Sequence, residues 1–215
     1  MALHYDEAVA HRYVDLRPGY GWGYRVPFRP APYNYFTTYE ALRGALAAAP
    51  DADQPARVAA WDFLPPAVSD PLAGGFTTSV PANAITVPYR ALFGVNYQYD
   101  AASRTYARFN NGVREIDGEN REPVAAKNIV VILTEVHITD AFGLDPAGNP
   151  KLDMELTGSG AGIVFRDGRR QEVTWTRPDI FDAFSLRNAA GEAVRLSPGQ
   201  TWIQIVPKDW TIPSQ

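Results

Sequence analysis

The stretch GSGAGIVFRDGRRQEVTW, residues 158–175, decides the fold of the larger part of this chain. A dinucleotide-binding loop needs its third glycine one position later and a helix after it, whereas Gly162 leads directly into an apolar, β-branched run. Asp167-Gly168 is instead a favoured pair for a two-residue hairpin turn, because both residues tolerate a positive φ. We predict that residues 163–166 pair antiparallel with 171–175, and that the glycines mark a bend, a bulge or a close backbone approach.

The same alternating pattern continues on both sides of this hairpin. From about residue 83 the chain consists of short runs with a period of two, separated by turn sequences such as NNG, DG, NAAG and SPGQ. The runs are AITVPY, GVNYQYD, TYARFN, KNIVVILTEVHI, KLDMELTG, GIVFRD, QEVTWTR, AFSLRN, EAVRLS and TWIQIVP. They predict an all-β domain over residues 83–215, antiparallel and either closed into a barrel or packed as a sandwich.

Residues 1–82 have a different character. A helix is predicted over residues 38–49, because Thr37 and Glu40 have capping-box spacing and Pro50 stops the pattern. The chain from 50 to 82 is rich in Pro, Asp, Ala and Gly, which favours a long connection. We expect residues 1–82 to be a small, partial α/β portion with an aromatic segment, one helix and this connection. The whole chain is then α+β and β-rich.

Composition excludes several classes of function. The chain of 215 residues has no cysteine, which excludes disulfides, thiol catalysis and cysteine-ligated zinc. Its net charge is −4 and shows no basic excess, so we expect no nucleic-acid partner. The apolar run IVVIL is too short to span a membrane and predicts a buried strand. The first residues, MALHYDEAVAH, lack the basic and apolar regions of a signal peptide.

The aromatic and arginine-rich segment of residues 20–36 is the most site-like feature of the sequence. Aromatic rings stack on sugars or bases, and arginine side chains such as Arg29 bind carboxylates or phosphates with two hydrogen bonds. The alternative is that these rings only pack at the joint between the two parts of the chain. We expect a ligand site where this segment meets the β-domain, with Arg29 and Asn34 orienting the ligand and Tyr33 offering a ring face.

Other chemistry is predicted to be absent. His137 follows Glu135 on one strand, with Asp140 beyond, and a strand-end surface histidine is favoured over a metal ligand. Asp100 and Asp117 flank one hairpin, and turn capping explains both. No G-x-S-x-G motif is present. We therefore expect no metal and no cofactor.

Several segments carry a resemblance to a known family. They are APYNYFTTYEAL (31–42), YQYDAASRTYARFNNGVREIDG (97–118), KNIVVIL (127–133), GSGAGIVFRDGRRQEVTWTR (158–177) and GEAVRLSPGQTWIQIVP (191–207). Together they resemble the YerB-like bacterial lipoproteins, a family of unknown function, and correspond to its C-terminal portion. The resemblance implies an exported, extracytoplasmic protein, with an α/β portion followed by a β-rich domain and a lipid anchor that is absent from this chain.

The resemblance also carries over to single positions. The family's Pro-His-Asn motif falls on Pro32, Tyr33 and Asn34, so tyrosine stands where the family has histidine. Its aspartate after the NNG turn falls on Asp117, and its Gly-x-Gly and Trp fall on Gly158, Gly160 and Trp175. The resemblance implies no reaction, because the family's activity is itself uncharacterised.

Two functions from different classes follow. The first is a non-catalytic binding or scaffolding module whose partner is an envelope glycan, a peptide or an envelope protein, with a membrane reached only through the lipid anchor. The ligand-binding residues are then Arg29, Tyr33, Asn34, Tyr106, Arg108 and Asp117. The alternative is a hydrolase acting on a cell-envelope polymer through Asp117 and Asn34 near Arg29. Catalytic residues are not identifiable from the sequence, and we favour the binding module over the enzyme.

Overall fold

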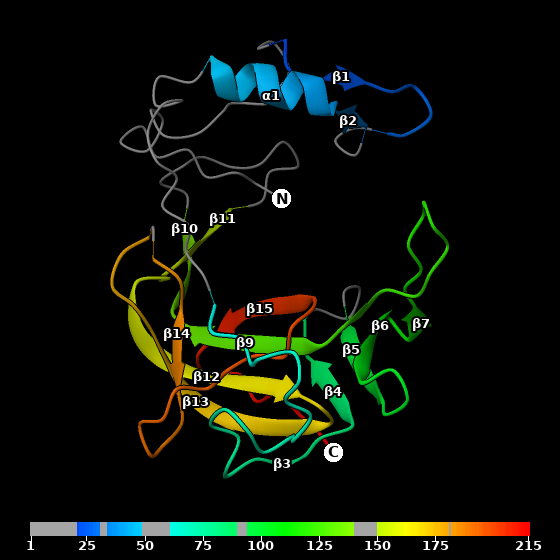
Figure 1. The fold of residues 1–215 in the computed structure, drawn as a ribbon. Coiled ribbons are helices and arrows are strands. Elements are labelled where there is room, and N and C mark those ends of the chain that lie inside the picture. Colours follow the sequence, from blue (N-terminus) through cyan, green and yellow to red (C-terminus); the bar gives the residue numbers. More distant parts are fainter. Residues whose placement is uncertain (1–20, 31–33, 49–60, 90–93, 140–149, 181) are drawn as a thin grey trace. The chain divides into compact units, whose positions relative to one another are not determined.

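The computed structural model describes residues 21–30, 34–48, 61–89, 94–139, 150–180 and 182–215. The chain divides into two compact units, residues 1–57 and 58–215 (Figure 1). The first unit contains the strands β1 (Tyr24–Arg25) and β2 (Tyr35–Phe36), which pair antiparallel, and the helix α1 (Tyr39–Ala47). No described helix is long and apolar enough to cross a membrane.

The predicted helix is present, but its predicted cap is wrong by one residue. The hydroxyl of Thr38 accepts a hydrogen bond from the backbone N–H of Ala41 at 3.1 Å, so Thr38 is the N-cap. The Thr37 hydroxyl instead donates to the Trp22 carbonyl oxygen at 2.6 Å. The first unit therefore ties the start of α1 to the chain ahead of β1.

The second unit is built on a six-stranded sheet. Its order is β14 (Ser185–Arg187), β13 (Arg169–Arg177), β12 (Gly158–Arg166), β9 (Asn128–Thr134) and β15 (Thr201–Pro207). The short strand β3 (Val80–Pro81) also pairs with β13. All of these pairs are antiparallel except β15 with β9, which is parallel. Two strands that lie about 70 residues apart in sequence thus become neighbours, which local sequence patterns do not reveal.

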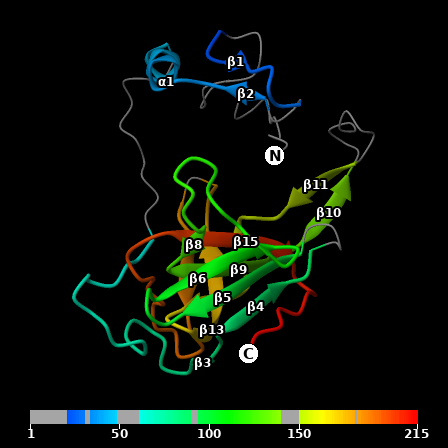
Figure 2. The same cartoon turned by 90° about the vertical axis from the view of Figure 1, so that its right-hand side faces the viewer.

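A second, five-stranded sheet lies next to the first. It contains β4 (Ala84–Val87), β5 (Val95–Asp100), β6 (Thr105–Asn110) and β7 (Val113–Arg114), with β8 (Ala125–Ala126) also paired to β6. Figure 2 shows β4, β5 and β6 side by side as one layer. A separate hairpin of β10 (Val136–Thr139) and β11 (Lys151–Met154) extends away from both sheets in the two views (Figures 1 and 2).

The core consists of two clusters, one on each face of the six-stranded sheet. The first joins the two sheets and contains Ile129, Val131, Ile163, Phe165, Ile85, Tyr97 and Tyr106. The second lies on the opposite face and contains Val130, Ile132, Val164, Trp175, Phe76, Leu186 and Leu196. β9 is buried on both faces, which explains why the IVVIL run is continuously apolar rather than alternating.

The β-rich α+β class is confirmed. The described sheets are open and mainly antiparallel, and no closed barrel forms among the described strands. The predicted strand over EAVRLS is wrong: Val194 and Leu196 are buried in the second core, but the segment makes only isolated bridges. Its backbone bonds alternate between partners on different segments, including Leu186 and Gly74, so no continuous ladder can form.

Part of the connection predicted for residues 50–82 belongs structurally to the second unit. The Leu64 N–H donates to the Leu196 carbonyl at 2.8 Å, and β3 pairs with β13. Phe76, from the same segment, is completely buried in the second core. The division of the protein into domains at residue 82 stays a prediction.

The hairpin predicted from the opening stretch is confirmed. Ile163 pairs with Glu172 and Val164 with Gln171, and the turn residues Asp167 and Gly168 have φ values of 52° and 70°. The pairing is continuous through the glycines, so no bulge is present in this ladder. Gly160 marks a close approach instead, because a Cβ there would lie 2.8 Å from Cζ2 of Trp175.

Candidate functional site

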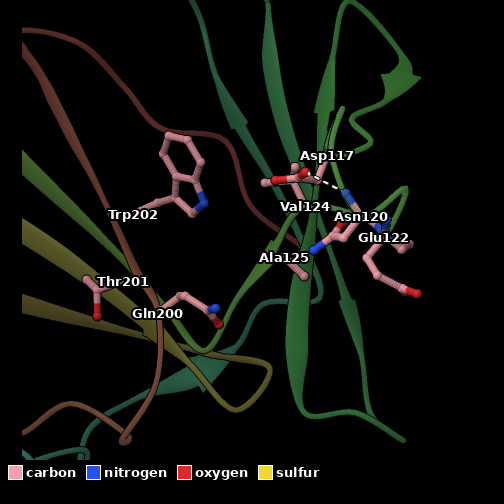
Figure 3. A pocket seen from close by; sticks show the side chains of 9 residues that line it. Asp117, Asn120, Glu122, Val124, Ala125, Gln200, Thr201 and Trp202 are labelled. Atoms are coloured by element: carbon pink, nitrogen blue, oxygen red, sulfur yellow. Dashed lines mark hydrogen bonds between the residues drawn. The ribbon is translucent and has the colours of Figure 1, made fainter. Parts of the chain in front are cut away.

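An open cavity of about 430 Å³ lies in the second unit, between the β7–β8 connection and the start of β15. Its lining residues are Asp117, Asn120, Glu122, Pro123, Val124, Ala125, Gln200, Thr201 and Trp202. Figure 3 shows the Trp202 ring on one side of the cavity and the side chains of Asp117 and Asn120 across from it. One wall is therefore aromatic and the opposite wall is polar.

The polar wall is held by a short hairpin that continues from β6. The Glu115 N–H donates to the Arg108 carbonyl and the Val124 N–H donates to the Glu115 carbonyl, each at 2.9 Å. At the tip, the Asp117 N–H donates to the Glu122 carbonyl at 2.8 Å. These bonds fix the tip against β6, so the cavity wall is set by backbone pairing.

Asp117 is one of two carboxylates in the lining of the cavity, with Glu122. Its Oδ1 accepts hydrogen bonds from the backbone N–H groups of Glu119 at 2.8 Å and Asn120 at 3.2 Å. These two bonds, that from Glu119 first, lower the pKa of the Asp117 carboxyl below its usual value. The interpretation of Asp117 as a turn cap is confirmed, and the side chain is an ionised hydrogen-bond acceptor at neutral pH.

Trp202 is the aromatic wall, and its position depends on Arg108. The guanidinium of Arg108, on β6, lies 4.6 Å from the centroid of the Trp202 ring and forms an ion pair with Glu115. The Arg108 side chain is only 13% exposed, so this cation–π contact is largely shielded from water. The ring is thereby held against β6, with part of it still lining the cavity.

A buried hydrogen-bond network supports the same strand behind Trp202. Gln204 donates through Nε2 to the Tyr97 hydroxyl at 2.6 Å and accepts through Oε1 from the Tyr89 hydroxyl at 2.8 Å. Burial raises the pKa of both tyrosines, so both phenols stay neutral and can donate. The network links β15 to the five-stranded sheet and limits movement of Trp202.

The structure brings two of the six predicted ligand-binding residues to this region. Asp117 lines the cavity, and Arg108 contacts its aromatic wall. Tyr106 lies elsewhere: it is completely buried, its hydroxyl donates to the Ala82 carbonyl at 3.2 Å, and burial raises its pKa. Its side chain belongs to the first core cluster.

The remaining predicted residues belong to the first unit. Arg29 has its guanidinium 5.6 Å from the centroid of the Phe36 ring, and Asn34 accepts through Oδ1 from Arg25 at 2.5 Å. Tyr33 lies outside the described residues. A ligand site where the 20–36 segment meets the β-domain stays a prediction.

Sequence reasoning missed the aromatic wall and most of the polar one. Trp202 packs against the first core cluster, but it also lines the cavity. Asn120 lies in a turn and Gln200 directly precedes β15, in segments whose sequences are typical of turns. The one signal that could have marked Trp202 as partly exposed is its position two residues after the SPGQ turn, as the second residue of a strand.

The other candidate groups have structural roles. His137 approaches Glu155 with 3.3 Å between Nε2 and Oε1, Glu135 pairs with Lys208, and Asp140 lies outside the described residues. Asp100 caps its turn by accepting from the Ala102 N–H at 2.9 Å. Within the described ranges, no group of three His, Cys, Asp or Glu side chains could hold a metal ion.

Comparison with known proteins places the chain in a family. Residues 85–203 match the model of the C-terminal domain of DUF3048, a family of proteins of unknown function, and this range includes most of both sheets and all residues that line the cavity. The chain belongs to this family. The resemblance to YerB-like proteins that the sequence motifs indicated is confirmed.

The sequence and structure comparisons both match YerB of Bacillus subtilis. The chain is 27% identical over 191 residues to the protein named "Putative lipoprotein YerB" of strain 168, covering 86% of this chain and 51% of that protein. It also resembles the crystal structure of the YerB protein, with a TM-score of 0.62 and 24% identity over 90% of this chain and 60% of the other. The chain thus spans about half the length of the curated relative.

Proposed function

We propose that this chain is a carbohydrate-binding module of an exported, lipid-anchored envelope protein. The observation that carries the proposal is the Trp202 ring, held by Arg108 and facing the polar groups of Asp117 and Asn120 across a cavity. The relative's name as a lipoprotein supports an extracytoplasmic location. Envelope glycans are the carbohydrates available there.

The lining of the cavity fits the chemistry of a sugar. A pyranose has an apolar face of C–H groups that stacks on an aromatic ring, and hydroxyls at its edge that need donors and acceptors. Asp117 supplies an anionic acceptor, the Gln200 amide supplies a donor and an acceptor, and Asn120 supplies its Nδ2 donor, because its Oδ1 already accepts from the Glu122 N–H at 2.8 Å. A volume of about 430 Å³ lies within the usual range for small-ligand sites.

Binding fits Asp117 better than acid catalysis does. A general acid in glycoside cleavage needs a carboxyl whose pKa is raised, so that it carries a proton to donate. The backbone N–H groups of Glu119 and Asn120 act in the opposite direction and lower the pKa of Asp117. The carboxylate is therefore suited to accept hydrogen bonds from hydroxyls. Hydrolysis of an envelope polymer stays the alternative.

Isothermal titration calorimetry with chitotriose, a trimer of N-acetylglucosamine, tests the proposal, with maltotriose as a second sugar. Wild-type protein should bind at least one of them saturably, and Trp202→Ala should weaken binding at least tenfold. Trp202→Phe should keep part of the affinity, because a ring remains for stacking. Trp61→Phe, which changes an indole outside this cavity, is the matched control and should bind like the wild type.

Two results contradict the proposal. If Trp202→Ala binds the sugar as tightly as the wild type, the sugar does not bind at the Trp202 cavity. If neither sugar binds saturably, the proposal that the ligand is a carbohydrate is wrong. Mass spectrometry of the same mixtures after long incubation detects cleaved sugar. Cleavage that depends on Asp117 would favour the hydrolase over the binding module.

A further inference from the structure

A second cavity, of about 440 Å³, opens where two strands of the six-stranded sheet separate. Its lining includes Leu133 and Glu135 at the end of β9, Ser159 and Ala161 on β12, Glu155 after β11, and Lys208 after β15. None of these residues lines the cavity around Trp202. The two sites are thus distinct parts of the second unit.

Trp175 is the reason that the two strands separate. Pairing between β12 and β9 ends at Gly162 with Ile132, although β12 continues to Gly158. The Trp175 indole lies close to Gly160 and donates through Nε1 to the Leu133 carbonyl at 3.1 Å. That carbonyl, the next one along β9, is therefore occupied by an indole rather than by a backbone N–H of β12.

The separation leaves part of β12 with an open edge. A two-residue turn is closed by a hydrogen-bonded pair, here Arg166 and Arg169, and hydrogen-bonded pairs then alternate along the ladder. By this alternation Ser159 and Ala161 direct their backbone groups away from β13. On that side neither residue has a partner in β9. An unpaired strand edge of this kind is a template for another strand.

The cavity rim adds charge to this edge. Lys208 forms an ion pair with Glu135, and the hydrogen bond to that carboxylate raises the pKa of the Lys208 ammonium. Glu155 is 63% exposed, and its Oε1 lies 3.3 Å from Nε2 of His137. The lining of the cavity thus has two carboxylates and one ammonium, and this excess of negative charge favours a basic group in the ligand.

We infer that this cavity binds an extended peptide segment of a partner protein, which adds as a strand to Ser159–Ala161 and directs a Lys or Arg side chain toward Glu155. Strand addition uses backbone hydrogen bonds for affinity and one side-chain contact for selectivity. The inference is independent of sugar binding, because it uses another cavity and other residues.

The probe is an acetylated, amidated pentapeptide of sequence TVKVT, titrated into the whole chain. Calorimetry gives its affinity, and ¹H–¹⁵N spectra report the Ser159 and Ala161 amides. We expect saturable binding with shifts at these amides, and at least tenfold weaker binding of the same peptide N-methylated at both valines. The peptide TVEVT should also bind more weakly than TVKVT, and Glu155→Gln should reduce that difference.

A pair of variants at one position separates backbone from side chain. Ser159→Pro removes the edge-facing N–H and should weaken TVKVT binding at least tenfold, whereas Ser159→Ala keeps it and should bind like the wild type. If Ser159→Pro does not fold, the N-methylated peptide on wild-type protein makes the same test. Absent binding, equal binding of the N-methylated peptide, or equal binding of TVEVT overturns the inference. So does concentration-dependent self-association through these amides, which would assign the edge to a second copy.

Discussion

The guanidinium of Arg166 lies 4.0 Å from the centroid of the Phe76 ring, although the two residues come from segments 90 positions apart. Arg166 is completely buried, and it donates to the carbonyl oxygens of Arg195 at 2.5 Å, Ala73 at 2.7 Å and Pro71 at 3.1 Å. One cation thus fixes the irregular chain around residues 71–76 to the six-stranded sheet. Burial lowers its pKa, and the nearby Asp167 carboxylate opposes that effect.

Arg166→Met should destabilise the second unit by about 3 kcal/mol or more, because three part-buried carbonyls lose a charged donor whose side chain is itself completely buried. Arg166→Lys should be destabilising as well, since a single ammonium cannot reproduce the planar fork. Urea denaturation measures both. Arg195→Ala is the control, because it removes an exposed side chain and keeps the carbonyl; it should change the free energy of unfolding by less than about 0.5 kcal/mol. Equal stability of Arg166→Met and wild type would contradict this role.

Gly160 should resist any side chain. A Cβ there would lie 2.8 Å from Trp175, so Gly160→Ala must displace the indole and weaken its bond to Leu133. We expect a loss of about 1–3 kcal/mol, typical of overpacking a core contact, together with a change in tryptophan fluorescence. Gly118→Ala is the matched control, because a Cβ there meets nothing within 4 Å. The close-approach interpretation fails if the two variants unfold at the same urea concentration.

The cap of α1 offers a test within the first unit. Thr38→Ala should cost about 1 kcal/mol of local stability, because the Ala41 N–H loses its acceptor. Thr38→Ser keeps an acceptor and should behave like the wild type. Hydrogen exchange of the Ala41 amide measures this directly, with faster exchange expected only in Thr38→Ala. If the Ala41 amide of Thr38→Ala exchanges at the wild-type rate, Thr38 is not the cap and the prediction of Thr37 stands instead.

The pH dependence of Asp117 follows from the direction of its pKa shift. Its pKa is lower in the folded state than in the unfolded chain, so its stabilising contribution is complete above the unfolded value, about 3.9, and is lost as pH falls through the folded value. Wild type should therefore exceed Asp117→Asn in stability at pH 7, with the difference shrinking below pH 4. An NMR titration of the carboxyl should give a midpoint under about 3.9. A midpoint above that value contradicts the hydrogen-bond assignment.

Local features of the sequence predicted the elements well, and nonlocal pairing explains what they did not predict. The Asp167-Gly168 turn and the alternating runs depend on residues a few positions apart, so their pattern is visible in the chain itself. The cavity wall formed by Trp202 exists only because β15 pairs parallel with β9 and packs beside β6. Thr37 and Thr38 are chemically identical, and the cap falls on Thr38 because the helix begins at Tyr39, whereas Thr37 bonds to the distant Trp22.

The contact between Arg108 and Trp202 is best measured by a double-mutant cycle, because each residue has other partners. Arg108→Met also leaves Glu115 without its cation, and Trp202→Leu also removes core packing, so neither single change isolates the cation–π contact. With both singles and the double variant, the coupling free energy should be about 0.5–2 kcal/mol, as for partly desolvated cation–π pairs. Chemical denaturation at pH 7 gives the four stabilities, and Glu115→Gln in the same series shows how much of the Arg108 effect comes from the ion pair. Additive effects within about 0.3 kcal/mol would mean that the guanidinium does not hold the ring, and the wall of the sugar site would then rest on the Gln204 network alone.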